Sequence, residues 1–145
     1  MGSCELRYKL NGTTYSGLSI KDKIKQVNKV YIPTYNSSST RTSSDYLWLL
    51  SCAEIWDNGY KSTGKGYAMG IEGNQYKYYK STLGSTAYNS STDITKKPNT
   101  SSSSYWWLRS PYYDDSNLFC SVTSGGRCSG NSFGTSNGVA PGFCI

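Results

Sequence analysis

The feature that most restricts how this chain can fold is a change of composition at Pro111. Before it stands a compact apolar block, Tyr105-Trp106-Trp107-Leu108. After it, residues 112–137 are nearly all Tyr, Ser, Asn, Asp, Gly and Thr. This is the composition of a binding surface, in which Tyr supplies rigid amphipathic area and the small polar residues supply adaptable hydrogen bonds. Ordinary turns use the same polar residues, so composition alone leaves both interpretations open.

The chain has 145 residues, a length that predicts a single domain over residues 1–145. The first three residues, Met-Gly-Ser, resemble a cloning remnant, so we expect the natural protein to carry more N-terminal sequence. That sequence could include a targeting signal or a further domain. No segment approaches the about 20 apolar residues of a membrane span, and we expect no membrane insertion.

The net charge of +6 belongs to the first two-thirds of the chain, since every lysine precedes Pro98. The lysines are scattered among serines and tyrosines, without the run of about five to eight basic residues that nucleic-acid patches contain. A solvated basic surface therefore explains the charge better than nucleic-acid binding does.

The five cysteines are Cys4, Cys52, Cys120, Cys128 and Cys144, and the chain has no histidine. Neither a zinc site of ordinary Cys/His spacing nor a histidine-dependent nucleophile fits, so we expect no metal, no cofactor and no enzymatic activity. The odd count favours buried thiols over a disulfide framework. A Cys120–Cys128 bridge across a hairpin stays open as an alternative.

Local patterns predict an α+β protein with one or two helices, short antiparallel strands and long ordered loops. Residues 5–10 alternate and meet Asn11-Gly12, which predicts a strand and hairpin turn. Ser19 then caps a predicted helix over residues 20–31, which Pro33 ends. An apolar run over residues 46–50 predicts a buried strand.

The second half is predicted to be mostly strands and loops. Residues 75–80 fit a helical turn or a strand, and the pattern does not decide between them. Short strands are predicted over residues 105–109, 118–122, 127–129 and 138–145. Long ordered loops on a compact scaffold are typical of functional segments.

A second property separates the tail from the rest of the chain. Residues 112–145 contain no Lys, Glu, Gln, Met or Trp. Every residue there can be encoded by a codon ending in a pyrimidine, and most arise by replacing the adenines of an asparagine codon. The pattern is that of a region diversified at adenines, with chance in a Ser/Gly-rich tail as the competing explanation.

These motifs resemble the C-type-lectin-fold variable proteins of diversity-generating retroelements, found in gut bacteria and their phages. The resemblance rests on WWLRSP at residues 106–111, FCSV at 119–122, Gly126, and GV with GFCI at 138–139 and 142–145. Upstream, IKQV at 24–27, SDYLWLLS at 44–51 and EGNQY at 72–76 are similar to members of the same family. One departure is Ala140, where many relatives carry Arg.

The resemblance implies a C-type lectin-like scaffold that displays a variable C-terminal surface, rewritten through an error-prone reverse transcriptase. It implies that Trp106, Trp107 and Leu108 fix the start of that surface. It also implies that its strands are held by the apolar residues Phe119, Val122, Val139, Phe143 and Ile145. The expected location is a cell surface or a phage virion, and the expected partner is a protein or cell-surface ligand.

The expected ligand-binding residues all lie in the tail and have polar or aromatic side chains. Alternation along the strand predicts that Ser121 and Thr123 point outward and Val122 points inward. Aromatic residues and Arg dominate interface energetics. The full set is Tyr112, Tyr113, Asp114, Asp115, Ser116, Asn117, Ser121, Thr123, Ser124, Arg127, Ser129, Asn131, Ser132, Phe133 and Thr135.

Three other functions remain open. A fixed-specificity glycan-binding lectin would use calcium through carboxylate and amide oxygens, for which Asp114, Asp115 and Asn117 are the candidates. An enzyme on a related fold is disfavoured, because adjacent Asp114 and Asp115 point to opposite faces of a strand. A structural domain of a larger surface or phage tail protein would have display as its role.

Overall fold

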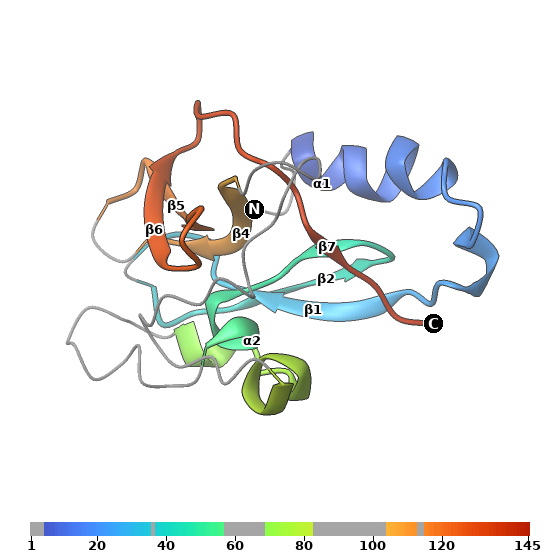
Figure 1. Cartoon of the computed structure of the whole chain (residues 1–145), viewed down its shortest axis with the longest axis horizontal. Helices are drawn as coiled ribbons and strands as arrows, with labels where there is room; N and C mark the ends of the chain where they lie inside the picture. Colours follow the sequence, from blue (N-terminus) through green and yellow to red (C-terminus); the bar gives the residue numbers. More distant parts are fainter. Residues whose placement is uncertain (1–4, 36, 57–68, 83–103, 113–114) are drawn as a thin grey trace.

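The computed structural model describes residues 5–35, 37–56, 69–82, 104–112 and 115–145. They form a mixed α+β fold with few helices and small antiparallel sheets, as the sequence predicts. Figure 1 shows the helical N-terminal segment lying across one side of the strands, with the sheet of the C-terminal region at the other end. The C-terminal segment crosses between these two parts.

The predicted N-terminal strand and hairpin are wrong, because this segment is helical. Helix α1 (Glu5–Lys9) continues into a π-helical segment, Leu10–Thr14. Leu6 and Leu10 are four residues apart, so they share one helix face and both pack into a hydrophobic cluster. Asn11, instead of turning a hairpin, accepts from the backbone N–H of Tyr46 at 2.6 Å and donates to the carbonyl of Leu47 at 2.9 Å.

The predicted helix over residues 20–31 is also wrong. The structure has a single 3₁₀ turn, Lys21–Lys23, and then strand β1 (Val27–Tyr31). Strand β1 pairs antiparallel with β2 (Arg41–Asp45) over all five residues. Pairing with β2 overrides the helical spacing of the apolar residues and selects the extended form.

Two further sheets complete the fold. Strand β3 (Trp48–Leu49) pairs with β7 (Pro141–Gly142), and β4 (Trp106–Pro111) pairs with β5 (Leu118–Val122), which pairs with β6 (Cys128–Ser132). The predicted strand over residues 118–122 is confirmed, and those over 105–109 and 127–129 overlap β4 and β6. The long final strand is wrong, since only β7 and single bridges at Gly138 and Cys144 form.

Among the described residues, three short helical elements follow β3 along the chain before β4 begins. Helix α2 (Cys52–Ile55) begins with a capping box, in which Ser51 and Glu54 exchange side-chain-to-backbone hydrogen bonds. A 3₁₀ turn, Met69–Glu72, and a π-helical turn, Tyr78–Thr82, follow. The second of these shows that the end of the undecided segment 75–80 is helical.

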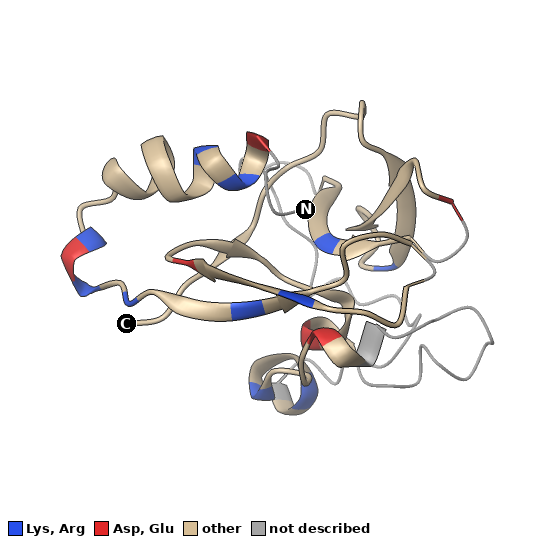
Figure 2. Ribbon diagram, turned by 180° about the vertical axis from the view of Figure 1, so that it is seen from behind, with Lys and Arg blue, Asp and Glu red and all other residues tan. Residues whose placement is uncertain are grey.

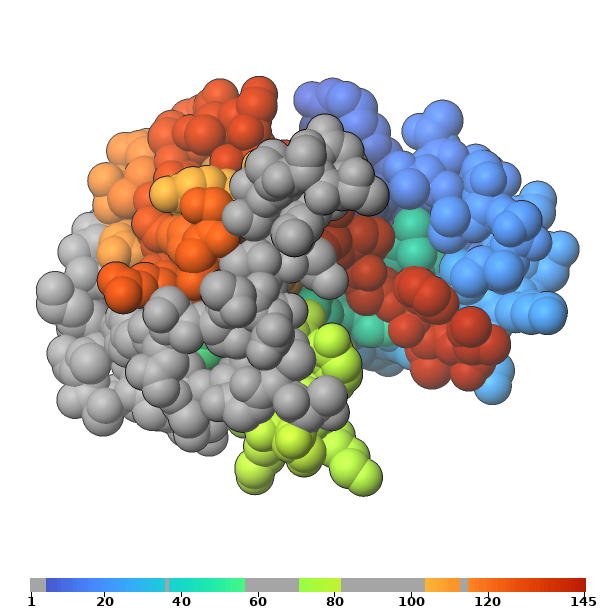
Figure 3. Space-filling model, viewed as in Figure 1, coloured from blue at the N-terminus to red at the C-terminus, as the bar shows by residue number. Residues whose placement is uncertain are grey.

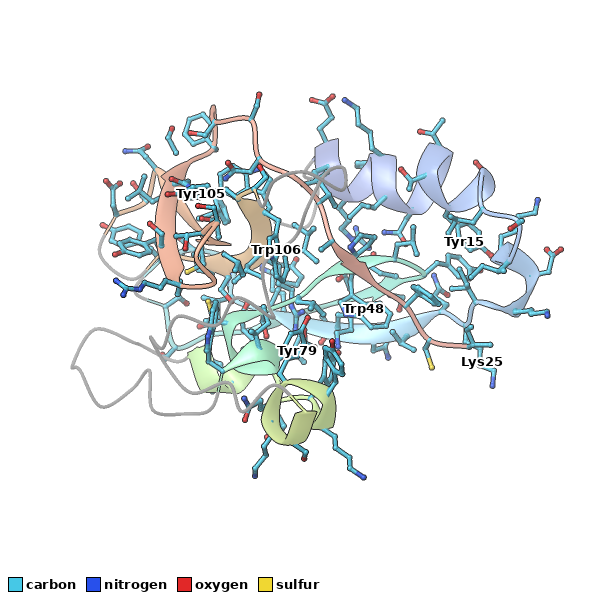
Figure 4. All side chains as sticks on the ribbon, in the orientation of Figure 1. Tyr15, Lys25, Trp48, Tyr79, Tyr105 and Trp106 are labelled. Carbon is cyan, nitrogen blue, oxygen red and sulfur yellow. The ribbon has the colours of Figure 1, made fainter. Side chains whose placement is uncertain are left out.

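The main hydrophobic cluster lies between the β4–β6 sheet, strand β3 and helix α2. Its fully buried members include Ile55, Trp56, Trp106, Leu108 and Val122. Figure 4 shows the side chains of Trp106, Trp48 and Tyr79 gathered in this region. The fold thus closes its core on one face of the C-terminal sheet.

A buried charged network joins β4 to the rest of the scaffold. Arg109 donates to the carbonyls of Val30 at 3.0 Å, Leu49 at 2.8 Å and Glu72 at 2.8 Å. It also donates to the Glu54 carboxylate at 2.5 Å, which accepts from Lys29 as well. Burial disfavours the charged form of Glu54, but Arg109 and Lys29 outweigh burial and lower the pKa of its carboxyl.

Glu72 has the opposite shift, because its burial outweighs the attraction of Arg109 and raises its pKa above 4.5. Its carboxylate accepts from the backbone N–H of Ile32 at 3.1 Å and from the hydroxyl of Ser110. A carboxyl with a raised folded pKa stabilises the fold below its unfolded pKa, and that contribution is lost as pH rises through the folded pKa.

We therefore expect Glu72→Gln to remove a decline of stability above the ordinary carboxyl pKa of 4.5. Urea unfolding between about pH 5 and about pH 7.5 measures this decline. The matched control is Glu5→Gln, because the exposed Glu5 has a lowered pKa from its pairing with Lys9 and titrates below 4.5. Parallel stability curves for the wild type and Glu72→Gln above that pH would contradict the prediction.

Candidate functional site

The C-terminal sheet has a gradient of burial from β4 to β6. In β4 every residue except Trp107 is buried, β5 is buried over its last three residues, and β6 has no buried residue. In Figure 3 the orange part of the chain, which contains β5 and β6, lies at the surface at one end of the molecule. Except for Cys128, which packs against the main cluster, the side chains of β6 can therefore change without removing a residue from the core.

A bulge in β4 explains how the four consecutive residues 108–111 are buried there. The pairing with β5 shifts register between Trp107 and Pro111. A bulge re-aims side chains that a regular strand would send to alternate faces. Leu108, Arg109 and Ser110 are consequently all buried, and Arg109 reaches the charged network.

The hairpin between β5 and β6 is closed by backbone and side-chain bonds. The N–H of Thr123 donates to the carbonyl of Arg127 at 2.8 Å, and the N–H of Arg127 donates to Thr123 Oγ1 at 3.0 Å. Gly126 has a φ of 78°, the left-handed region that favours glycine. The turn thus fixes Thr123 but leaves the side chains of Ser124 and Arg127 exposed.

The predicted ligand-binding residues include partly buried, buried and exposed side chains, and two lie outside the described residues. Those partly buried are Tyr112, Asp115, Thr123, Ser129 and Asn131, and Ser121 is buried. Tyr113 and Asp114 lie outside the described residues. The exposed group, which we term the tail surface, consists of Ser116, Asn117, Ser124, Arg127, Ser132, Phe133 and Thr135.

The prediction that Ser121 points outward is wrong, because its side chain is not exposed to solvent. It lies between Trp107 and Ser129 in the sheet and has no exposed area. Its hydroxyl donates to the carbonyl of Ser129 at 3.3 Å and accepts from Asn131 Nδ2 at 2.8 Å. The alternation places Val122 inward as predicted, but both faces of β5 are covered at this point.

The residues expected to hold the strands are only partly in the core. Trp106, Leu108 and Val122 are fully buried, as predicted, whereas Trp107 is half-buried against the second cluster. The expectation is wrong for Val139, Phe143 and Ile145, which are exposed. Their segment approaches β3 through Gly142 instead, where an added Cβ would lie 2.8 Å from Trp48 Nε1.

Tyr112 has a structural role that the composition did not reveal. An added Cβ on Gly130 would meet its ring at 2.8 Å, so the ring lies against the backbone of β6. The same ring packs against the main cluster. Gly130 is thus required where the tyrosine crosses the sheet, and Tyr112 presents only part of its surface to a ligand.

The loop before β5 and the segment after β6 meet at the end of the β5–β6 hairpin opposite its turn. Asp115 Oδ1 accepts from the N–H of Asn117 at 2.8 Å, and the carbonyl of Asn117 accepts from the N–H of Phe133 at 3.4 Å. Phe133 itself is 71 % exposed, more than any other large hydrophobic residue among those described. The charged residues in described positions after Pro111 are Asp115 and Arg127, so Figure 2 shows little charge around this surface.

A groove of about 550 Å³ lies away from the tail surface and was not anticipated from the sequence. Its lining includes Lys29, Trp48, Tyr76, Tyr78 and Phe143, which come from four separate segments. Lys29 Nζ lies 4.7 Å from the ring centre of Trp48, a cation–π contact. The density of tyrosines over residues 76–79 was the available sequence signal.

The comparisons with known proteins place the chain in a family. A family model described as "Domain of unknown function (DUF6273)" matches residues 2–145. The chain belongs to the DUF6273 family. No curated protein and no solved structure matches it significantly. Within the described part of this DUF6273 domain, no helix has the length and apolar character needed to span a membrane.

Proposed function

We propose that this DUF6273 chain is a ligand-binding display domain with a C-type lectin-like fold. In this proposal a retroelement diversifies its C-terminal region at adenines, and the tail surface binds a protein or cell-surface ligand. The observation that carries the proposal is the burial gradient across β4–β6. It separates the buried strand β4 from the half-buried strand β6 and from exposed residues in the adjoining loops.

The chemistry of the tail surface supports the same function. Arg127 at the turn of the β5–β6 hairpin and Phe133 at its other end each lie among small polar side chains, and interface hot spots are enriched in aromatic residues and Arg. The few helices, short antiparallel strands and long connections are compatible with the C-type lectin-like fold. A cell-surface or virion location, and a further N-terminal domain, belong to the proposal.

The first test is the DNA around the gene. We expect a near-copy of the 3′ end beside a reverse transcriptase gene, with mismatches at adenines. The mismatches should fall on codons for the tail surface and spare those for the buried Trp106, Leu108 and Val122. Mismatches spread equally over both groups of codons, or no near-copy at all, would contradict diversification of this surface.

The second test is tolerance to simultaneous replacement. Changing Ser116, Ser124, Arg127, Phe133 and Thr135 together to alanine should lower the free energy of unfolding by no more than about 2.5 kcal/mol, because isolated surface changes stay within about 0.5 kcal/mol each. Urea unfolding measures the change. The control is the single change Ser121→Ala, which removes a buried hydrogen-bond partner and should cost about 1 kcal/mol alone. Loss of folding in the fivefold variant would contradict a display role.

Glycan binding with fixed specificity is a second candidate, favoured by the aromatic groove beside Lys29. A calcium site would need Asp114, which lies outside the described residues, and Asp115, whose Oδ1 already accepts from Asn117. A glycan array with and without calcium separates the candidates. Glycan binding lost in Tyr78→Ala but kept in Phe133→Ala would place the ligand in the groove instead of on the tail surface.

A further inference from the structure

Three cysteine side chains converge at the inner side of the C-terminal sheet. Cys52 comes from α2, Cys120 from β5 and Cys128 from β6. Their sulfur atoms all lie within 4.8 Å of one another, and the sulfurs of Cys52 and Cys128 are 3.7 Å apart. All three are thiols, so the Cys120–Cys128 disulfide left open by the sequence does not form.

The Cys52–Cys128 separation matches the spacing that a metal ion imposes on sulfur ligands, and the third sulfur lies within 4.8 Å of both. Zinc–thiolate bonds of about 2.3 Å in a tetrahedron hold two sulfurs about 3.8 Å apart. The Cys52–Cys128 distance already has this value. A small adjustment of side chains would therefore bring the three sulfurs to bonding distance from one central ion.

The donor set restricts the kind of ion. Among the described residues, this is the one group of three or more His, Cys, Asp or Glu side chains with its ligand atoms so close together. Thiolates select soft, thiophilic ions over the hard ions that prefer carboxylates. Three sulfurs satisfy Cu⁺ directly, whereas Zn²⁺ would take a fourth ligand from solvent.

Two of the three thiols are shielded from solvent, and the third is reachable from the surface. Cys52 and Cys120 are buried, and Cys128 is half-buried. Burial raises the pKa of the Cys52 thiol, and the thiol contacts with Cys128 and Cys52 raise that of Cys120. Metal binding would accordingly release protons from neutral thiols as they become ligands.

We propose that Cys52, Cys120 and Cys128 form a three-thiolate site for a thiophilic metal ion, Zn²⁺ or Cu⁺. The bound ion joins α2 to β5 and β6, and so fastens the sheet that carries the tail surface to the scaffold. An ion that binds the folded chain and not the unfolded one stabilises it by mass action. The proposal is independent of what the tail surface binds.

The test uses the full chain, reduced and handled without oxygen. Zn²⁺ and Cu⁺ are added separately, with Co²⁺ as a spectroscopic probe of thiolate ligation. We expect one equivalent of Zn²⁺ or Cu⁺ by native mass spectrometry, a thiolate-to-Co²⁺ charge-transfer band, and a melting temperature that rises with the concentration of the ion that binds. Failure of both Zn²⁺ and Cu⁺ to bind at one equivalent would overturn the proposal.

Variants separate the cluster from the other thiols. Cys128→Ser, at the half-buried position, should weaken binding by on the order of 100-fold or more, since loss of a direct ligand exceeds the about 10–100-fold effect of losing an outer-shell partner. The matched control, Cys4→Ser/Cys144→Ser, should bind like the wild type. Loss of binding in that control would place the metal elsewhere and overturn the assignment.

Alkylation of the wild-type chain provides a measurement that does not depend on the variants folding. Bound metal should slow the labelling of Cys128 by iodoacetamide and leave that of the exposed Cys144 unchanged. Equal labelling of Cys128 with and without metal would contradict the proposal. A Cys52–Cys128 disulfide in protein purified under reducing conditions would make the cluster a redox pair and would also overturn it.

Discussion

Replacing Arg109 with methionine should lower the free energy of unfolding by about 3–5 kcal/mol, the range for breaking a buried ion pair by removing one partner. Methionine keeps an unbranched side chain in the same place but donates no hydrogen bond. The Glu54 carboxylate would keep Lys29 as its cation, and the carbonyls of Val30, Leu49 and Glu72 would lose their donor. Each buried polar group left without a partner adds to the loss.

Urea unfolding at neutral pH measures the effect, and Arg127→Met is the matched control. Arg127 is exposed on the hairpin turn, so the same chemical change there should stay within about 0.5 kcal/mol. A loss at Arg109 of under about 1 kcal/mol would mean that the network contributes little to stability.

A double-mutant cycle then identifies the partner responsible. Arg109→Met combined with Glu54→Gln should be less destabilised than the sum of the two changes, by about 0.5–3 kcal/mol, because the second change removes the carboxylate that the first leaves underpaired. Additive effects would assign the loss to the carbonyl bonds alone. The cycle thereby separates the charge pair from the backbone contacts of the same guanidinium.

The network also explains a limit of prediction from the sequence. The WWLRSP motif predicts a strand, but nothing local indicates that Arg109 turns inward. The bulge in β4 and the position of Glu54, 55 residues earlier in the chain, decide its orientation. Long-range contacts of this kind leave no local period in the sequence.

The predictions for the N-terminal segments were wrong for a related reason. Residues 5–10 have Leu6 and Leu10 at a spacing that suits both a strand and a helix. The contacts that decide the matter are tertiary, since Asn11 bonds to residues 46 and 47 and Leu10 packs with Ile24, Leu47 and Leu49. By contrast, β5 was predicted correctly, because its pairing partner follows after a short turn.

The candidate sites also differ in whether they depend on residues that are near or far apart in the sequence. The exposed residues of the tail surface lie close together in sequence, so their composition was visible without a structure. The sulfurs of Cys52 and Cys128 meet across 76 positions of sequence, and the expectation of no metal site considered only ordinary ligand spacing. The prediction that Ser121 is exposed was wrong, because alternation shows which face of a strand a side chain is on but not whether that face is covered.

Truncating the buried Trp106 and the exposed Phe133 should separate stability from binding. Both changes remove an aromatic ring, but Trp106 has no exposed area and Phe133 is 71 % exposed. Trp106→Ala should lower the free energy of unfolding by about 3–5 kcal/mol, through lost burial and the cavity left in the main cluster. Phe133→Ala should change it by no more than about 0.5 kcal/mol.

The binding measurement should give the reverse order. After a ligand has been identified, Phe133→Ala should weaken the affinity of the protein for it by about 30-fold or more if the ring is a hot spot of about 2 kcal/mol. Trp106→Ala, at a temperature where most molecules remain folded, should bind nearly as the wild type does, because its ring faces the core. If Phe133→Ala destabilises the fold as much as Trp106→Ala does, the ring is covered in solution and the tail surface is not the binding face. If the two variants are equally stable and only Trp106→Ala loses binding, the ligand site lies on the inner side of the sheet, and the division between framework and display surface is wrong.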